Sequence, residues 1–167
     1  ALMHDFEISE TGPSPVLFHP YLSGERTPHN DAEARGAFFG LSRAHDRREM
    51  TRAVVEGVAF ALADAVDVLA GASARPSSLL ATGGGARSRQ WLQIIAAVTQ
   101  CPITVPAGGD FGAALGAARL GQAAAGNLGV EKLTAIMQKP DMAEQIDPDK
   151  TLTDAYEEAI MRWRDLY

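Results

Sequence analysis

The residues best placed for chemistry are glycines that follow two short apolar segments of the chain. Residues 79–81 are apolar and lead into the run Gly83-Gly84-Gly85-Ala86-Arg87-Ser88, after which a helical pattern begins. Glycine allows a positive φ angle and a close approach between backbone and ligand, and the amides that open a helix attract anions and polar ligand edges. The run is therefore typical of a turn that binds a nucleotide.

A second glycine cluster favours the same interpretation. Gly108-Gly109-Asp110 precedes a helical pattern that contains Gly112 and Gly116, which lower helix propensity and leave a smooth helix face. A packed helix, a sheet or a ligand must approach that face closely. Asp110 stands at a position from which it can cap the helix.

The elements around both clusters alternate between strand and helix. We expect strands at residues 79–82 and 103–105, and helices at about 89–100 and 111–125. Strands joined by helical crossovers pair in parallel, and ligands bind outside the carboxyl ends of such strands. The expected fold class is therefore α/β, with both glycine clusters at one edge of the sheet.

The glycine run alone does not identify its ligand. Its spacing nearly matches a dinucleotide-binding turn, but Ser88 stands where the third glycine is needed. No acidic residue ends the expected strand at 103–105, as that class of site requires. A plain strand-to-helix turn is an equally good interpretation, and an NAD-binding oxidoreductase fragment is an alternative.

A long amphipathic helix is expected upstream of the glycine run. Asp46 and Glu49 have the spacing of a capping box, and apolar residues then recur at helical intervals as far as Gly71. The acidic residues of this helix are expected on a solvated face, although one of them, near its start, could point at a ligand. They are Glu56, the one near the start, and Asp64 and Asp67.

Two short strands are expected before that helix, at residues 16–18 and 37–41. The loop between them is rich in turn residues and contains Glu25 and Arg26. We expect these two charges to hold the loop by an ion pair, which contributes little when exposed, and not to take part in catalysis.

Composition limits the classes of function. The chain has 167 residues, 46% of them apolar, and a formal net charge of -6. That charge argues against a broad grip on nucleic acid or on an anionic membrane surface, so neither is expected as a partner. The single cysteine, Cys101, is expected to be a small buried hydrophobe, and the histidines lack the close pairing of a zinc site. These features predict a reducing, cytoplasmic setting.

The most specific pattern lies before and within the expected long helix. Gly36-x-Phe38-x-Gly40-Leu41, followed after seven residues by Glu49-Met50-x-x-Ala53-Val54-Val55-Glu56, resembles the second signature of the FGGY family of carbohydrate kinases at every defined position. Residues 18–28, the glycine run and residues 109–119 are similar to the bacterial subgroup that phosphorylates the ketose xylulose.

This resemblance implies an incomplete actin-like ATPase or RNase H-like domain, with a mixed sheet flanked by helices. Residues 1–138 would form the nucleotide-binding portion of the C-terminal kinase domain. Residues 139–150 would form a connecting loop and 153–167 a helix, so that 139–167 packs on the same domain. The first and second phosphate loops, the sugar pocket and the aspartate that acts as base would lie outside the chain.

The resemblance also implies a set of nucleotide-binding residues and no catalytic or metal-binding residue here. Gly84 and Gly85 would lie against adenine, and Ser88 could reach the nucleotide or cap the next helix, which we favour. Arg89 stands where the family often has an Asn. Arginine donates hydrogen bonds but cannot accept them, so Arg89 could stack on the base or turn to solvent. Trp91 is expected to pack in the core behind the turn and not to stack on adenine.

By resemblance, the intact enzyme transfers the γ-phosphoryl group of ATP to D-xylulose, giving xylulose 5-phosphate. Mg²⁺ would be held mainly by residues outside this chain, which is expected to be inactive alone. Its expected partners are ATP or ADP, a ketose, the N-terminal kinase domain and, in one alternative, a second copy in a homodimer. Ribulose, gluconate and glycerol are alternative substrates, and a folding or assembly unit that self-associates through exposed apolar surface is a non-enzymatic alternative.

Overall fold

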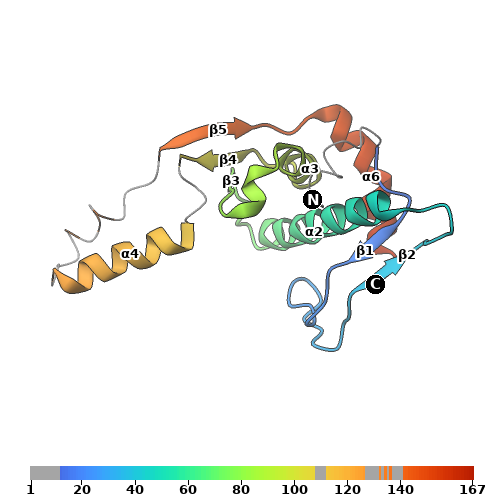
Figure 1. Cartoon of the computed structure of the whole chain (residues 1–167), viewed down its shortest axis with the longest axis horizontal. Helices are drawn as coiled ribbons and strands as arrows, with labels where there is room; N and C mark the ends of the chain where they lie inside the picture. Colours follow the sequence, from blue (N-terminus) through green and yellow to red (C-terminus); the bar gives the residue numbers. More distant parts are fainter. Residues whose placement is uncertain (1–11, 108–111, 127–131, 133, 135, 137–140) are drawn as a thin grey trace.

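Two small sheets and the helices beside them make up the part of the chain that the computed structural model describes, which is residues 12–107, 112–126, 132, 134, 136 and 141–167 (Figure 1). The elements in chain order are β1 (Leu17–His19), β2 (Ala37–Phe39), α2 (Arg47–Gly71), β3 (Leu79–Leu80), the 3-10 helix η1 (Gly84–Arg87), α3 (Arg89–Thr99), β4 (Ile103–Pro106), α4 (Gly112–Ala125), β5 (Met142–Ile146) and α6 (Lys150–Arg164).

The larger sheet has the strand order β3-β4-β5. β3 and β4 are parallel, with Leu79 opposite Ile103, and α3 connects them, which confirms the predicted strand-helix-strand unit. β5 runs antiparallel to β4, with Ile146 opposite Ile103. The sheet is therefore mixed, and the predicted α/β class is correct.

The prediction of a connecting loop at residues 139–150 was wrong where β5 forms. Only Ile146 at the end of β5 is buried, and the other four residues are exposed or half-buried. A strand of this kind is held by its backbone pairing with β4, which leaves almost no apolar alternation in the sequence to detect.

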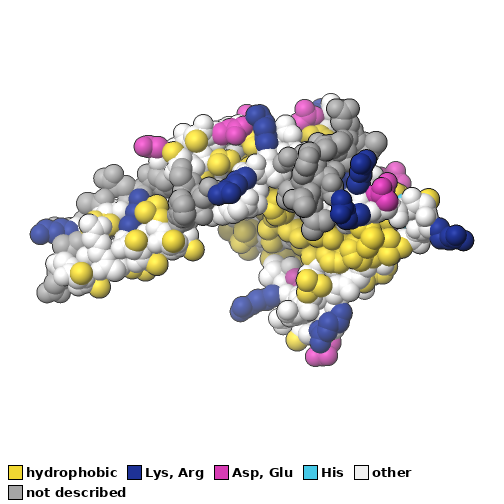
Figure 2. Space-filling model, in the orientation of Figure 1, with side chains coloured by type: hydrophobic (Ala, Val, Ile, Leu, Met, Phe, Trp, Pro, Cys, Tyr) yellow, Lys and Arg dark blue, Asp and Glu magenta, His cyan; other side chains and the backbone are white. Residues whose placement is uncertain are grey.

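α2 begins as predicted. The backbone N–H of Arg48 donates to Asp46 Oδ1 at 2.6 Å, and the N–H of Asp46 donates to Glu49 Oε2 at 2.9 Å, which completes a capping box. The helix packs against α3 and β1 and contributes Ala59 and Phe60 to the core. Figure 2 shows hydrophobic side chains over α2, and the exposed hydrophobic residues of this helix are Leu62, Val68 and Leu69.

α6 returns to the start of the described chain and is fixed to β1 through Trp163, which is 1% exposed. The indole Nε1–H of Trp163 donates to the Phe18 carbonyl at 2.7 Å, and the His19 ring nitrogen Nε2 lies 2.9 Å from the Trp163 carbonyl. The His19 and Trp163 rings also meet edge to face, with centroids 4.8 Å apart. Residues 144 and 145 positions apart in the chain are thus held together by two hydrogen bonds and a ring contact.

The Glu25 carboxylate holds the loop between β1 and β2, but it does so through backbone N–H groups and not through the predicted ion pair with Arg26. Among the described residues, Glu25 Oε2 accepts the backbone N–H groups of His29 at 2.8 Å and Asn30 at 3.2 Å. Tyr167 stacks on the His29 ring with centroids 3.5 Å apart and donates its hydroxyl to Asp31 at 2.9 Å. The carboxylate closes this loop on itself, and the last residue of the chain fastens the loop to the end of α6.

The prediction that Glu56 lies on a solvated face was wrong. Glu56 is 1% exposed, and its Oε1 accepts hydrogen bonds from Arg52 Nε and from the Tyr156 hydroxyl, both at 2.7 Å. Its Oε2 accepts the backbone N–H of Ser14 at 2.9 Å. Burial raises the pKa of Glu56, while these three donors stabilise the ionised form. We call Ser14, Arg52, Glu56 and Tyr156 the Glu56 cluster.

Asp64 was also expected on a solvated face, and that prediction was wrong too. Asp64 is 6% exposed and forms an ion pair with Arg164. Asp67, one turn further on, stays exposed as predicted. Cys101 is 2% exposed and its thiol lies 3.5 Å from the Pro76 carbonyl, which confirms its expected place in the core. No described helix combines the length and the hydropathy that a membrane crossing requires.

The Glu56 cluster generates a prediction about stability. Glu56→Gln keeps the shape of the side chain but leaves the buried Arg52 guanidinium without its carboxylate, so the free energy of unfolding should fall by about 3 kcal/mol. Urea titration followed by tryptophan fluorescence measures the change. Glu158→Gln, an exposed site on α6, is the control and should change stability by less than about 0.5 kcal/mol. Equal midpoints for the two variants would contradict the role given to Glu56.

Candidate functional site

The glycine run folds as a tight turn directly after β3. Gly83 has a φ of +83°, a backbone conformation that favours glycine, and the 3-10 helix η1 starts at the next residue. The N–H of Ala86 donates to the Gly83 carbonyl at 3.1 Å, and the N–H of Ser88 donates to the Gly85 carbonyl at 3.2 Å. The turn therefore has a defined shape before any ligand binds.

Trp91 supports this turn from behind. A Cβ atom built on Gly85 would lie 2.5 Å from Cζ3 of the Trp91 ring, so only glycine fits there. The indole Nε1–H of Trp91 donates to the Val55 carbonyl of α2 at 3.0 Å, which fixes the ring. Trp91 is half-buried against the core, in agreement with the packing role expected for it.

Gly84, next to Gly85, faces open space. A Cβ atom built on Gly84 meets no described atom within 4 Å. The two adjacent glycines thus differ: Gly85 is required by the packing of the protein, whereas nothing in the described structure requires Gly84. A ligand can approach the backbone on the Gly84 side.

Ser88 caps α3, as favoured from the sequence. Its Oγ accepts the backbone N–H of Trp91 at 3.4 Å, and its carbonyl accepts the N–H of Leu92 at 3.1 Å. Ser88 is 4% exposed, so its cap places the first turn of α3 beside the glycine turn. A contact between Ser88 and a nucleotide stays a prediction.

Arg89, at the start of α3, forms an exposed ion pair with a residue of β5. Its guanidinium lies 3.0 Å from the Glu144 carboxylate of β5, and 65% of its side chain is exposed. The sequence did not predict this partner because β5 was expected to be a loop. An exposed ion pair contributes little to stability, and contact between Arg89 and a nucleotide stays a prediction.

The second glycine pattern meets the first at the end of β3. A Cβ atom built on Gly112, the first residue of α4, would lie 3.1 Å from Cβ and 3.2 Å from Oγ1 of Thr82. The close approach that the sequence predicted for the glycine face of α4 is present at Gly112, whereas a Cβ atom built on Gly116 would meet no described atom within 4 Å. The rest of that cluster, Gly108 to Asp110 with the predicted cap, lies outside the described residues.

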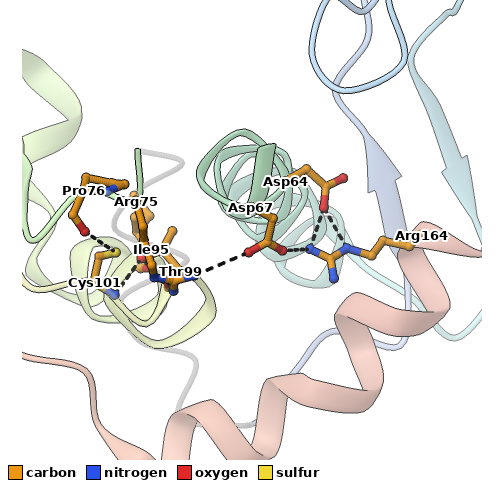
Figure 3. Close-up of polar contacts among 8 residues, drawn as sticks. All are labelled: Asp64, Asp67, Arg75, Pro76, Ile95, Thr99, Cys101 and Arg164. Atoms are coloured by element: carbon orange, nitrogen blue, oxygen red, sulfur yellow. Dashed lines mark hydrogen bonds and ion pairs between the residues drawn. The ribbon is translucent and has the colours of Figure 1, made fainter. Parts of the chain in front are cut away.

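A separate cavity of about 490 Å³ lies between α2, α3 and α6. Figure 3 shows ion pairs beside it that join Arg164 of α6 to Asp64 and Asp67 of α2. Arg164 contacts Asp64 at 2.6 Å and Asp67 at 2.7 Å, and Asp67 also lies 3.9 Å from Arg75. Both arginines are already neutralised by carboxylates, so they offer little charge to a phosphate. The sequence gave no signal for this cavity, because its residues are distant in the chain.

The described residues contain no group of histidine, cysteine, aspartate and glutamate side chains arranged to hold a metal ion. The candidate site is instead made of backbone: two glycines, the start of α3 and the start of α4. Amides that open a helix attract anions and polar ligand edges, so this surface suits a nucleotide better than a metal ion.

The fold and the signature around α2 together are those of one domain of a family of carbohydrate kinases. The model of the C-terminal domain of the FGGY family of carbohydrate kinases matches residues 4–125, and the chain belongs to this family. Its fold is the actin-like ATPase fold that the solved members share, as the sequence predicted.

Among particular members, the chain is similar to the xylulose kinase of Escherichia coli (strain K12), with 41% identity over 167 residues, 100% of this chain and 34% of that protein. The crystal structure of a xyloylose (xylulose) kinase from Brucella ovis superposes with a TM-score of 0.79 at 48% identity, over 98% of this chain and 34% of that one. A gluconate kinase from Lactobacillus acidophilus superposes with a TM-score of 0.72 at 30% identity, over 99% of this chain and 33% of that one. The chain thus spans about a third of the length of these relatives.

The contrast between the two glycines can be tested by stability alone. Gly85→Ala should lower the free energy of unfolding by about 1 to 3 kcal/mol, because the added methyl group collides with a ring that its hydrogen bond holds in place. Gly84→Ala should change it by less than about 0.5 kcal/mol. Urea denaturation of both variants measures the difference, and an equal loss in both would show that Trp91 does not define the turn.

Proposed function

We propose that this chain is the nucleotide-side, C-terminal part of an ATP-dependent kinase that phosphorylates a ketose, with D-xylulose as the first candidate. The observation that carries the proposal is the open backbone at Gly84, in a turn shaped without a ligand and held from behind by Trp91. Membership of the carbohydrate kinase family supports ATP as the nucleotide, and the similarity to xylulose kinases supports the sugar.

In this proposal, adenine lies against Gly84 and Gly85, with Ser88 and Arg89 at the start of α3 beside it. Residues 1–138 supply this surface and 139–167 complete the same domain. Mg²⁺, the phosphates, the ketose and the base that takes the hydroxyl proton are handled by the rest of a full-length kinase. Phosphoryl transfer depends mainly on position and charge, so a rigid nucleotide surface contributes by holding ATP at a fixed angle to the sugar.

Gluconate is the second candidate substrate, because a gluconate kinase superposes on this chain almost as well as the xylulose kinases do. Ribulose and glycerol are further candidates within the family. The residues that would discriminate between sugars are not among those assigned here, so the choice of sugar must be tested on the complete enzyme. An NAD-binding site is disfavoured because the third glycine of that pattern is Ser88, which caps α3.

The nucleotide assignment predicts that bulk at Gly84 blocks binding without unfolding the protein. Gly84→Val should weaken ATP binding at least tenfold, since its side chain enters the space proposed for adenine. Isothermal titration with ATP, and with NADH in competition, measures both ligands. Gly71→Ala, at another glycine with open space around it, is the control and should leave the affinity unchanged. Tight binding of NADH, or unchanged ATP binding in Gly84→Val, would contradict the proposal.

A second prediction concerns Arg89. Arg89→Asn supplies a side chain that both donates and accepts hydrogen bonds, so ATP should bind about two- to tenfold more tightly, a gain of about 0.4 to 1.4 kcal/mol. Glu144→Gln removes the same ion pair while keeping the arginine and serves as the control. If Glu144→Gln raises the affinity as much as Arg89→Asn does, loss of the ion pair explains the gain and Arg89 makes no contact with the nucleotide.

A further inference from the structure

The cavity between α2, α3 and α6 has the size of a small-molecule site. Its volume of about 490 Å³ lies within the range of about 300 to 1,000 Å³ that such sites occupy. No residue of the glycine turn, from Gly83 to Ser88, lines it. A ligand with a hydrocarbon body fits it, because part of its wall is apolar. This part consists of Ala97, Val98, Ile160 and Met161.

The two arginines that line the cavity are already paired with aspartates. Arg164 forms ion pairs with Asp64 at 2.6 Å and with Asp67 at 2.7 Å, and Arg75 lies 3.9 Å from Asp67 (Figure 3). Two arginines and two aspartates balance each other in charge. This side of the cavity therefore carries no net charge for a ligand to neutralise.

The α6 side of the cavity carries one carboxylate that is not balanced. Asp154 is paired with Lys150, with Nζ and Oδ2 3.0 Å apart. Glu157 also lines the cavity, but within the described part of the chain its carboxylate has neither a hydrogen bond nor an ion pair. The charge left over around the cavity is therefore a single negative one.

The end of α3 adds hydrogen-bond acceptors to the same wall. α3 ends at Thr99, and both Thr99 and Gln100 line the cavity. The Thr99 carbonyl accepts from Arg75 Nη2 at 2.9 Å, and the Ala97 carbonyl accepts from the Thr153 hydroxyl at 3.1 Å. The carboxyl end of a helix carries partial negative charge and favours cations. The end of α3 and the Glu157 carboxylate thus favour the same sign of ligand charge.

We propose that this cavity binds a small organic cation, a primary ammonium group on a short hydrocarbon chain. The ammonium group lies between the Glu157 carboxylate and the end of α3, and the hydrocarbon chain lies against Val98 and Met161. An anion is disfavoured because both arginines are paired. A metal ion is disfavoured because the described residues hold no group of side chains arranged to bind one. The bound cation contacts α3 and α6 together, so it stabilises the folded chain.

The probe for this site is pentylamine, which is an ammonium ion at about pH 7, and its neutral match is pentanol. Proton–nitrogen correlation spectra of this chain measure binding, and shifts are expected at residues 97–100 and 153–161. We expect a Kd of about 1 mM for pentylammonium, within the ceiling for very small ligands. Pentanol should bind about tenfold more weakly, because it leaves the Glu157 carboxylate without a charged partner.

Two neighbouring variants test the role of Glu157. Glu157→Gln should weaken pentylammonium binding about tenfold, which is the effect of one charge-assisted hydrogen bond. Glu158→Gln, at the next residue and outside the cavity lining, should leave the affinity unchanged. Both variants lose the same charge at an exposed position, so the comparison removes any effect of net charge. Circular dichroism checks that each variant is folded.

Three results would overturn the inference: no shift at the cavity residues, equal binding of pentanol, or equal weakening by Glu158→Gln. None of these measurements uses ATP or a sugar, so their outcome is independent of the proposed function. Saturating ATP should leave the affinity for pentylammonium unchanged, because the glycine turn lies outside the cavity lining. Displacement of pentylammonium by ATP would also contradict the inference.

Discussion

The buried carboxylate of Glu56 is the interaction on which the arrangement of this chain depends. It binds the Ser14 backbone, the Arg52 guanidinium and the Tyr156 hydroxyl, and so joins the start of the described chain, α2 and α6 at one point. A charge in the core is costly unless every lone pair is used, and here three donors share its two oxygens. The carbonyl of the preceding residue, Val55, accepts the indole N–H of Trp91, which in turn supports the glycine turn. The candidate site is thus two contacts away from the Glu56 cluster.

Local patterns in the sequence were sufficient for much of the fold. The capping box of α2, the parallel β3-α3-β4 unit and the Ser88 cap each depend on residues within a few positions of one another, and each was predicted correctly. The features that were missed depend on distant residues. Glu56 was expected in solvent because its partners at residues 14 and 156 cannot be inferred from the helix alone. β5 was missed because pairing with β4, and not burial, forms it.

The candidate site was predicted in outline, but its details came from the structure. The sequence marked Gly84 and Gly85 as equivalent members of one turn, whereas their surroundings separate them: Gly85 is fixed by Trp91 and Gly84 is open. The ion pair between Arg89 and Glu144 was not predicted, because Glu144 lies on β5, which was expected to be a loop.

The central claim is that the turn from Gly83 to Ser88 binds the nucleotide. Hydrogen exchange measured by mass spectrometry, with and without saturating Mg²⁺ and ATP, tests it directly, because a bound base shields the backbone amides of the turn from solvent. The account predicts slower exchange across residues 83–88 and no change around the cavity between α2, α3 and α6. Slower exchange at residues 97–100 and 153–161, which line that cavity, with none at 83–88, would contradict it.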